Sequence, residues 1–463
     1  MPMESLKADA VICGAGIAGI SAAYHLSVKQ GIKDILLVDE RPPITFTSDK
    51  STECYRNWFP GPGDTMVRFM NRSIDLLENL VEESGNYFHM NRRGYVFITA
   101  DSDRASQLMR SAEEITQLGA GPLRVHRGEA GDPIYSTCDP YELDPGITGA
   151  DMVLDPALIR KQYPFVSHEA MAMLHVRRCG WFSAQQLGMY LLNRAKEKGV
   201  RLIKGRVTGV TTNAGQIERV HVSTVSGPID ISTRTFVNAA GPFLKEVGAM
   251  IGVDFPVVNE LHGKISFEDP EGIIPRHVPL MIWEDPTELC WSKDNRSILS
   301  ESDETKWLLD EFPGGVHFRP EGGPDSRTVL AIWTYDVKVH EPVWPPEFPP
   351  DYAEIVVRGL ARMVPGLSVY LDKMSPPAVD GGYYCKTPEN RPLIGPLPVK
   401  GAYVIAALSG FGIMAAMAAG ELLADHVAEG KLAAYAPDFL LSRYEDPDYQ
   451  KLLASWDSGS GQL

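Results

Sequence analysis

The sequence has no closely spaced cysteine pair and no paired metal-ligand motif. Its six cysteines stand singly, without a CxxC pair, at Cys13, Cys54, Cys138, Cys179, Cys290 and Cys385. This pattern argues against a zinc ribbon or a dense disulfide framework, and it favours a reducing compartment, for which we expect the cytoplasm. The 11 histidines show no HExxH or similar spacing, so we expect no metal site.

Positive charge is also scarce. The chain has 44 Lys and Arg against 60 Asp and Glu, a formal net charge of -16 at pH 7. Such a surface repels nucleic-acid phosphates and anionic lipid, so we expect neither as a partner. The opening MPMESLKADAVI has no long apolar run behind a basic segment, so we expect no secretory signal peptide.

One uncharged run, residues 401–420, is long enough to span a bilayer. Ser409, Gly410 and Gly412 interrupt it in the middle, however. We therefore expect a short strand, a glycine turn and a small-residue helix there, and no membrane span.

What the chain does contain is an ordinary globular composition, with 44% hydrophobic and 22% charged residues over 463 positions. That length indicates more than one structural unit or one large composite fold. From the amino terminus, DAVICG predicts a strand, AGIAGISAAYHLSVKQG a helix and DILLVDE a second strand. The spacing Gly14-x-Gly16-x-x-Gly19, followed by Asp39, completes a dinucleotide-binding fingerprint.

The chemistry of that fingerprint explains the residue types. Glycines allow a tight turn, a close approach of the pyrophosphate at Gly16, and packing of helix on strand at Gly19. Unpaired amides at the helix start bind an anion without a basic patch, and Asp39 accepts hydrogen bonds from a ribose. The fingerprint alone leaves both NAD and FAD open.

Periodicity predicts further elements along the chain. Residues 65–84, 155–165 and 183–198 have helical spacing, and residues 94–99 read as a strand. Residues 255–375 are rich in proline and aromatics and contain several short strands, which favours an antiparallel layer. We expect the polar segment 446–463 to be a disordered C-terminal tail.

Five separated segments resemble one family. They are DAVICGAGIAGISAAYHL, LLVDERPP, RTFVNAAGPFLKEVG, GGVHFRPEGG and GGYYCKTPENRPLIGPLPVKGAYVIAALSGFGIMAAMAAGELLADHV. In this order they resemble the FAD-dependent oxidoreductases of the D-amino-acid oxidase, glycine oxidase and sarcosine oxidase superfamily. The resemblance implies an α/β fold, with a Rossmann-like FAD-binding domain and an antiparallel-sheet substrate domain. We expect the first from residues 1–85, 150–250 and 378–445, and the second from 86–149 and 251–377.

The resemblance also implies where FAD is held. The expected cofactor-binding positions are Gly14, Gly16, Ala18, Gly19, Asp39, Glu40, Arg41, Ser48, Lys50, Ser51, Val207, Ala240, Gly241, Gly410, Phe411, Gly412, Ile413 and Met414. The last five lie in the glycine turn SGFGIM, where helix amides would face a flavin ring; simple packing of helix on sheet is the alternative for that turn. The family's covalent cysteine aligns with Gly382, so we expect noncovalent FAD, with Cys385 the remaining candidate for a bond.

Three departures from the family bear on the substrate and on the reaction with oxygen. Met414 stands where sarcosine oxidases carry a carboxylate-binding lysine, and the strand TVLAIWTYD lacks their oxygen-activating lysine. The arginine of glycine and D-amino-acid oxidases is replaced by Tyr384. We therefore expect larger or more hydrophobic amines as substrates, and slow reaction of the reduced flavin with oxygen.

Two residues are expected to act on the substrate, Arg56 and Tyr384. By the resemblance, Arg56 approximately matches an arginine that contacts substrate in sarcosine oxidases, and its fork suits a carboxylate; a structural ion pair with Glu53 or another acid is the alternative. Strand alternation sends only one of Tyr383 and Tyr384 toward the cofactor, and we favour Tyr384, for which core packing is the alternative. Lys264 either points into the substrate cavity or, as we favour, lines an exposed strand.

The resemblance thus implies FAD-dependent oxidation of the C–N bond of an amine or amino acid, including secondary or N-substituted ones, to an imine. Electrons would pass to oxygen or to another acceptor. Two alternatives stay open: a flavin-binding assembly or scaffold protein without turnover, and an electron-transferring dehydrogenase.

Overall fold

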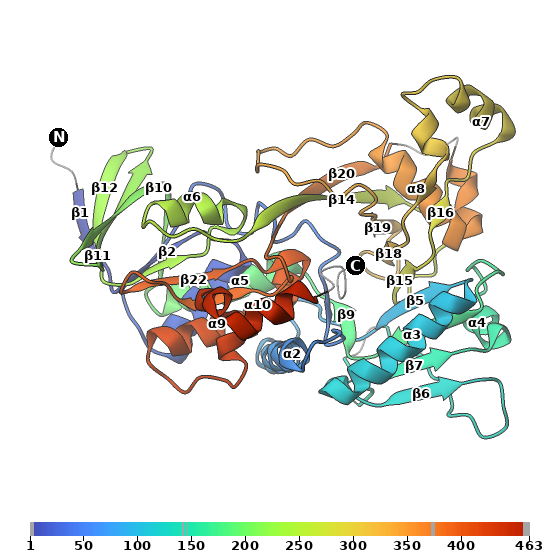
Figure 1. Ribbon diagram of the computed structural model, residues 1–463, viewed down its shortest axis with the longest axis horizontal. Helices are drawn as coiled ribbons and strands as arrows, with labels where there is room; N and C mark the ends of the chain where they lie inside the picture. Colours follow the sequence, from blue (N-terminus) through green and yellow to red (C-terminus); the bar gives the residue numbers. More distant parts are fainter. Residues whose placement is uncertain (1–3, 141–142, 145, 372–375, 457–463) are drawn as a thin grey trace.

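Two large sheets organise the protein (Figure 1). The computed structural model describes residues 4–140, 143–144, 146–371 and 376–456, and within them the two sheets have nine strands each. The expected α/β architecture is confirmed. Two short ribbons complete the strands, β4 (Cys54–Arg56) with β9 (Cys179–Trp181) and β16 (Thr287–Glu288) with β17 (Glu311–Phe312).

The first sheet has the order β1-β12-β11-β10-β3-β2-β13-β22-β21. Its strands are β1 (Glu4–Lys7), β2 (Ala10–Cys13), β3 (Ile35–Asp39), β10 (Arg201–Asn213), β11 (Gln216–Thr224), β12 (Gly227–Ser232), β13 (Phe236–Asn238), β21 (Leu393–Pro396) and β22 (Ala402–Ala406). The centre is parallel, because β2 pairs in parallel with β3 and β13, and β13 with β22. These central strands are buried apolar runs, as expected for strands covered on both faces.

The second sheet has the order β20-β14-β19-β18-β15-β5-β8-β7-β6 and is mostly antiparallel. Its strands are β5 (Tyr95–Thr99), β6 (Leu123–His126), β7 (Ala150–Val153), β8 (Ala172–Val176), β14 (Val258–Glu268), β15 (Leu280–Trp283), β18 (Val316–Pro320), β19 (Thr328–Ile332) and β20 (Ala378–Lys386). The antiparallel layer that proline and aromatic content indicated therefore lies here.

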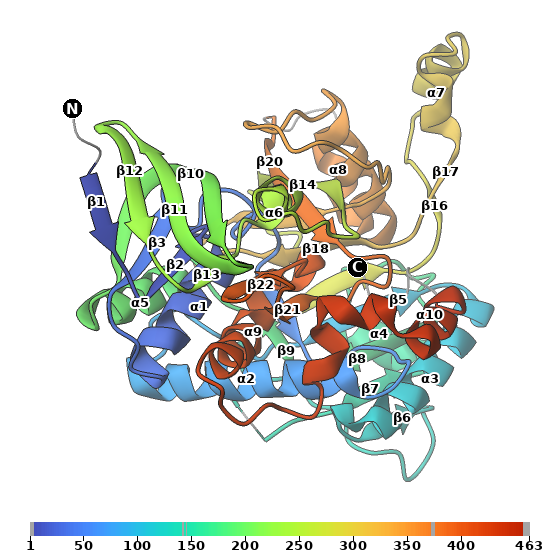
Figure 2. The ribbon, with the colours of Figure 1, turned by 60° about the vertical axis from the view of Figure 1, so that its left-hand side comes forward.

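Helices cover both sheets. They are α1 (Ile17–Tyr24), α2 (Thr65–Ser84), α3 (Ser102–Ile115), α4 (Pro156–Gln162), α5 (Ala184–Glu197), α6 (Leu244–Ala249), α7 (Lys293–Ser300), α8 (Tyr352–Met363), α9 (Gly412–Val427) and α10 (Pro447–Ala454). Helix α1 packs against α5 and α9, and α2 packs against α9, beside the first sheet (Figure 2). None of the helices in the described ranges has both the length and the apolar character needed to cross a membrane.

Several segments follow the sequence-based expectations closely. Helix α2 has the bounds that its periodicity predicts, and it ends at Gly85, which adopts a left-handed conformation with φ of 63°. The uncharged run at 401–420 forms β22, a turn and the start of α9, as the glycine pattern indicates.

The structure differs from the expected domain bounds in three places. β7 and β8, within the expected FAD-binding segment 150–250, are strands of the second sheet, and so is β20, within 378–445. In the expected disordered tail, residues 447–454 form helix α10, capped by the Asp446 side chain, so that expectation is wrong there. Residues 457–463 lie outside the described part of the chain.

Candidate active site

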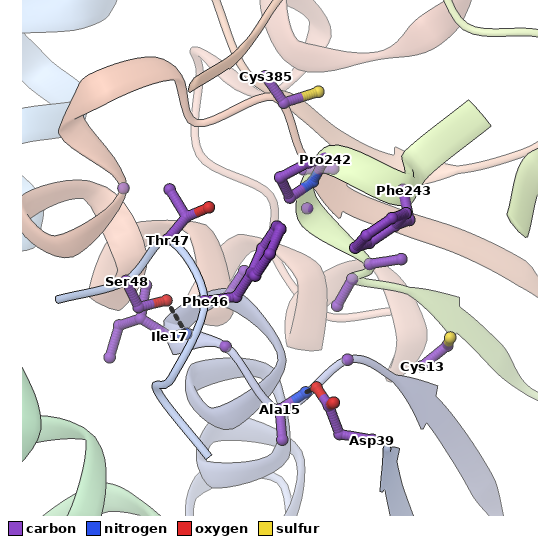
Figure 3. Close-up of a pocket in the computed structure, with 18 of the residues that line it drawn as sticks. Cys13, Ala15, Ile17, Asp39, Phe46, Thr47, Ser48, Pro242, Phe243 and Cys385 are labelled. Atoms are coloured by element: carbon purple, nitrogen blue, oxygen red, sulfur yellow. Dashed lines mark hydrogen bonds between the residues drawn. The ribbon is translucent and has the colours of Figure 1, made fainter. Parts of the chain in front are cut away.

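A cavity of about 230 Å³ opens at the carboxyl ends of β2 and β3 (Figure 3). This is the edge of a parallel sheet where α/β folds bind nucleotides. Its wall combines segments far apart in the chain, which include residues 13–18, 38–42, 44–48, 205–207, 239–243, 383–385, 405–410 and 412–413. Asp39 and Cys385 lie at opposite ends of it in Figure 3.

The fingerprint glycines serve close packing and the cavity, as their spacing predicts. Gly14 has φ of 111°, and a β carbon there would lie 2.3 Å from the Ala239 carbonyl oxygen. A β carbon at Gly19 would lie 1.9 Å from the Gly14 carbonyl oxygen, so Gly19 lets α1 pack against β2 and does not line the cavity. Gly16 does line the cavity.

Two side chains fix the loop before α1 (Figure 3). Asp39 accepts hydrogen bonds from the Ala15 amide at 2.7 Å and the Arg41 amide at 2.9 Å. Burial raises the pKa of Asp39, and these two amide hydrogen bonds oppose the rise. The Ile17 amide donates to Ser48 Oγ at 2.9 Å. The start of α1 is therefore tied to both Asp39 and the segment that contains Ser48.

Most of the expected cofactor positions line this cavity. These are Gly14, Gly16, Ala18, Asp39, Glu40, Arg41, Ser48, Ser51, Val207, Ala240, Gly241, Gly410, Gly412 and Ile413. Phe411 and Met414 line a neighbouring cavity instead. Lys50 lines neither cavity, so the expectation that it faces the cofactor is wrong. Its ammonium instead forms an ion pair with Asp380, 2.8 Å from Oδ2.

The neighbouring cavity, which we call the chamber, has a volume of about 60 Å³. It shares Ser51, Tyr384 and Gly410 with the first cavity. The residues that line it are Ser51, Thr52, Cys54, Arg56, Tyr95, His262, His317, Ile332, Tyr384, Gly410, Phe411 and Met414. The fold thus brings Arg56, Tyr384 and Met414 together from three distant segments.

One face of the second sheet forms a wall of the chamber. His317 on β18 pairs with Ile332 on β19, and Ile332 pairs with Lys264 on β14. Directly paired residues point to the same face, as do alternate residues along a strand, so His262 shares that face with Lys264. Sequence reasoning missed His262 and His317. The alternation of a strand shows that its side chains lie on two faces of the sheet, but only the strand register shows which face is directed toward the first sheet.

Tyr384 is held by a stack of rings. The His262 and Tyr384 rings are parallel within 20°, with centroids 3.9 Å apart. His262 Nδ1 lies 2.9 Å from Thr334 Oγ1, and its Nε2 lies 3.3 Å from Glu260 Oε2. Lys386 donates to the same Glu260 oxygen at 2.8 Å. Both imidazole nitrogens therefore contact protein groups, and the ring presents its flat face to Tyr384.

Arg56 lies among aromatic rings. Its guanidinium carbon is 4.8 Å from the Phe59 ring centroid and 5.9 Å from that of Tyr95. Glu53, the ion-pair partner considered for Arg56, instead has a carboxylate oxygen 3.7 Å from Arg319 Nη2. Arg56 thus brings a cation into the chamber.

Three further residues from the sequence analysis have distinct places. Tyr383 lines only the first cavity, and its hydroxyl accepts a hydrogen bond from the Val343 amide at 3.2 Å. The expectation that Lys264 is exposed is wrong, because its half-buried ammonium donates to the Asp49 carbonyl at 2.8 Å. Cys385 lines the first cavity, and burial raises the pKa of its thiol to about 12.

Comparison with known proteins identifies the family. The family described as FAD dependent oxidoreductase (DAO) matches residues 9–426. The chain belongs to this family. The resemblance seen in the sequence is therefore confirmed, and FAD is its cofactor.

Two known proteins and one solved structure are similar to the chain over most of its length. Human mitochondrial dimethylglycine dehydrogenase is 24% identical over 432 residues, which cover 92% of this chain and 43% of that protein. The mouse mitochondrial pyruvate dehydrogenase phosphatase regulatory subunit is 24% identical over 433 residues, 92% of this chain and 42% of that one. This chain thus spans less than half the length of these two relatives. The crystal structure of L-proline dehydrogenase from P. horikoshii has a TM-score of 0.72 and 20% identity, and the match covers 95% of this chain and 98% of that one.

The residues around the first cavity fit FAD. Gly241 lines the cavity with φ of 56°, and a β carbon there would have no atom within 4 Å, so the wall is open where a cofactor approaches. At Gly16, a β carbon would meet only Ser48 Oγ, at 3.2 Å. Asp39 supplies a carboxylate at the end of β3, where a ribose binds in such folds.

Proposed function

We propose that this protein uses FAD to oxidise the C–N bond of an amine or amino acid, including secondary or N-substituted ones, to an imine. Water then hydrolyses the imine. One observation carries the proposal: the chamber adjoins the cofactor cavity and shares Ser51, Tyr384 and Gly410 with it. A molecule in the chamber would therefore touch whatever lies beside these residues in the first cavity.

The proposed cofactor contacts follow from the cavity wall. Asp39 would bind the adenosine ribose, and the amides at the start of α1, around Gly16, would bind the pyrophosphate. The segment Gly410–Ile413 at the start of α9 would place amides near the flavin ring. When bound, FAD accepts the two electrons that leave the C–N bond. We propose noncovalent binding, because Gly382 has no thiol and the Cys385 thiol stays protonated, whereas the thiolate is the nucleophile.

The chamber residues would bind and orient the substrate. The Arg56 guanidinium would bind a carboxylate through its two-pronged donors, and within the described lining it is the only cation. Burial raises the pKa of the Tyr384 phenol, so its hydroxyl stays a neutral donor beside both cavities. Ile332, Phe411 and Met414 supply apolar surface that excludes water.

The test is anaerobic mixing of the holoprotein with a panel of amines and amino acids, followed by the flavin absorbance. Loss of the oxidised flavin band with at least one carboxylate-bearing amine, and release of the matching carbonyl product, is the expected result. If no member of a broad panel reduces the flavin while dithionite does, the proposal is wrong.

Two other functions have specific support. A flavin-binding assembly or scaffold role is favoured by the similarity to a regulatory subunit. A dehydrogenase that passes electrons to another acceptor is favoured by Ile332, an apolar residue on the chamber wall. Dye reduction without hydrogen peroxide would identify the dehydrogenase.

We further propose a cytoplasmic location and a small-molecule partner only. All six cysteines lie in the described part of the chain and are free, which supports a reducing compartment.

A further inference from the structure

The tautomer of His317 follows from one contact. His317 Nδ1 lies 2.9 Å from the Gly315 carbonyl oxygen. A carbonyl oxygen only accepts hydrogen bonds, so Nδ1 carries the proton in this contact. In a neutral imidazole the other nitrogen, Nε2, then holds a lone pair and is an acceptor.

His317 is neutral at physiological pH. Only 4% of its surface is exposed, and burial lowers the pKa of its imidazole to about 4, with the nearby Arg56 opposing a second positive charge. Within the described part of the chain, no group hydrogen bonds to its Nε2. His317 therefore brings to the chamber wall an acceptor nitrogen that has no hydrogen-bond partner among the described residues.

The second histidine of the chamber differs in this respect. Both nitrogens of His262 have protein contacts, with Thr334 and with Glu260. His317 is thus the imidazole with a nitrogen available to a ligand, and Arg56 is the cation in the same chamber. The pair is complementary to a molecule that has both a carboxylate and an N–H group.

We propose that His317 Nε2 accepts a hydrogen bond from the substrate amine, so that the chamber selects carboxylates with a primary or secondary amine over those with a tertiary amine. An amine loses hydride from its carbon most readily when it is neutral and its lone pair is free. A neutral primary or secondary amine still has an N–H to donate, whereas a neutral tertiary amine would turn an alkyl group or a lone pair toward Nε2. This assignment rests on the proposed function, because it takes the chamber as the substrate site.

Two planar carboxylates that cannot form an imine test the assignment. Pyrrole-2-carboxylate has a ring N–H next to its carboxylate, and 2-furoate has a ring oxygen in the same place. Each is titrated into the holoenzyme, and the dissociation constant comes from the change in flavin absorbance. We expect pyrrole-2-carboxylate to bind about tenfold more tightly, the size of one net hydrogen bond.

Substitutions separate His317 from the rest of the chamber. His317→Phe should remove the preference for pyrrole-2-carboxylate, and His317→Gln, whose side-chain oxygen accepts a hydrogen bond, should restore part of it. His221→Phe is the matched control, because His221 is partly exposed on β11 and outside both cavities, and it should leave the preference unchanged.

The outcomes distinguish the two proposals. If both probes bind and perturb the flavin but with equal affinity, or if His317→Phe and His317→Gln both keep the wild-type preference, the His317 assignment is wrong and the chamber remains the substrate site. If neither probe perturbs the flavin although amines of the panel reduce it, the His317 assignment alone is wrong. If neither probe perturbs the flavin and no amine of the panel reduces it, the proposed function fails, and the assignment fails with it.

Discussion

The Tyr384 ring lies directly against the α carbon of Gly410: a β carbon at Gly410 would be 2.4 Å from Tyr384 Cε2. His262 on β14 stacks on the same ring, with centroids 3.9 Å apart. Tyr384 thus contacts both a strand of the second sheet and the turn that begins α9, at the boundary of the two cavities.

Gly410→Ala should force this contact apart. We expect the free energy of unfolding to fall by about 1 to 3 kcal/mol, the usual cost of overpacking. Because the clash needs the ring, Gly410→Ala should cost much less in a Tyr384→Ala background. Urea unfolding of the two single variants and the double variant measures this coupling, and strictly additive effects would show that the ring has another support.

Gly16→Val should abolish flavin binding without unfolding the protein. The valine side chain would occupy the space beside Ser48 that the pyrophosphate needs. The measurement is the flavin-to-protein absorbance ratio after purification. Gly209→Val is the matched control: Gly209 lies on β10, and a β carbon there would meet His221 at an ordinary 3.5 Å. A yellow Gly16→Val protein would contradict the proposed pyrophosphate site.

Arg56→Ala should weaken binding of both pyrrole-2-carboxylate and 2-furoate to a similar extent. We expect a loss of about 2 to 4 kcal/mol, the range for removing one partner of a buried charge-assisted contact. The flavin content should stay the same, because Arg56 lines only the chamber. Unchanged dissociation constants would assign Arg56 to structure alone.

Stability should depend on pH through His25. Burial lowers the pKa of His25 to about 3, below the 6.5 of an unfolded histidine. The unfolded state therefore binds the proton more strongly, so the contribution of His25 to stability is complete above pH 6.5 and is lost as the pH falls toward 3.

His25→Leu should remove this dependence. Below pH 6, the slope of the unfolding free energy against pH should be shallower in the variant by up to about 1.4 kcal/mol per pH unit. Urea unfolding at a series of pH values between 7.5 and 5 gives the two slopes. Parallel curves would show that His25 titrates normally in the folded protein.

Oxygen should reoxidise the reduced flavin slowly. Negative charge develops on oxygen as it is reduced, and a fixed cation beside it would stabilise that charge. The only cation in the described chamber lining is Arg56, which lies against two aromatic rings, whereas Ile332 on β19 is apolar. Lys264, which pairs with Ile332 across the strands, donates to the Asp49 carbonyl instead. Stopped-flow mixing of photoreduced protein with air-saturated buffer measures the rate.

Ile332→Lys should accelerate this reoxidation roughly tenfold or more, since the added charge would face the chamber. Ile332→Met, of similar size and uncharged, is the control. Fast reoxidation in the wild type, with little change in Ile332→Lys, would show that another group already supplies the charge.

Local patterns in the sequence were enough to predict most of the lining of the first cavity and several helices. The fingerprint from Gly14 to Asp39 and the periodicity of α2 are short-range signals, and glycine at 85 marks where that helix ends. The turn before α9 could also be predicted from a short-range signal, because Gly410 and Gly412 interrupt an apolar run.

The chamber depends on long-range pairing, which no local pattern contains. His262, His317 and Ile332 meet only because β14, β19 and β18 pair in one register. The contacts of two lysines were equally impossible to predict from local sequence. Lys50 forms an ion pair with Asp380 on β20, and Lys264 donates to the Asp49 carbonyl in a loop. The local sequence of β7 and β8 predicts strands but does not indicate which of the two sheets they join. The expected domain bounds therefore differ from the observed sheets at these strands.

The most direct test of the account is a crystal structure of the holoenzyme with pyrrole-2-carboxylate. It should show FAD in the first cavity with its flavin ring beside Tyr384 and Gly410, the ligand carboxylate on Arg56, and the ring N–H on His317 Nε2. A ligand bound outside the chamber, or a flavin ring that does not border it, would contradict the account.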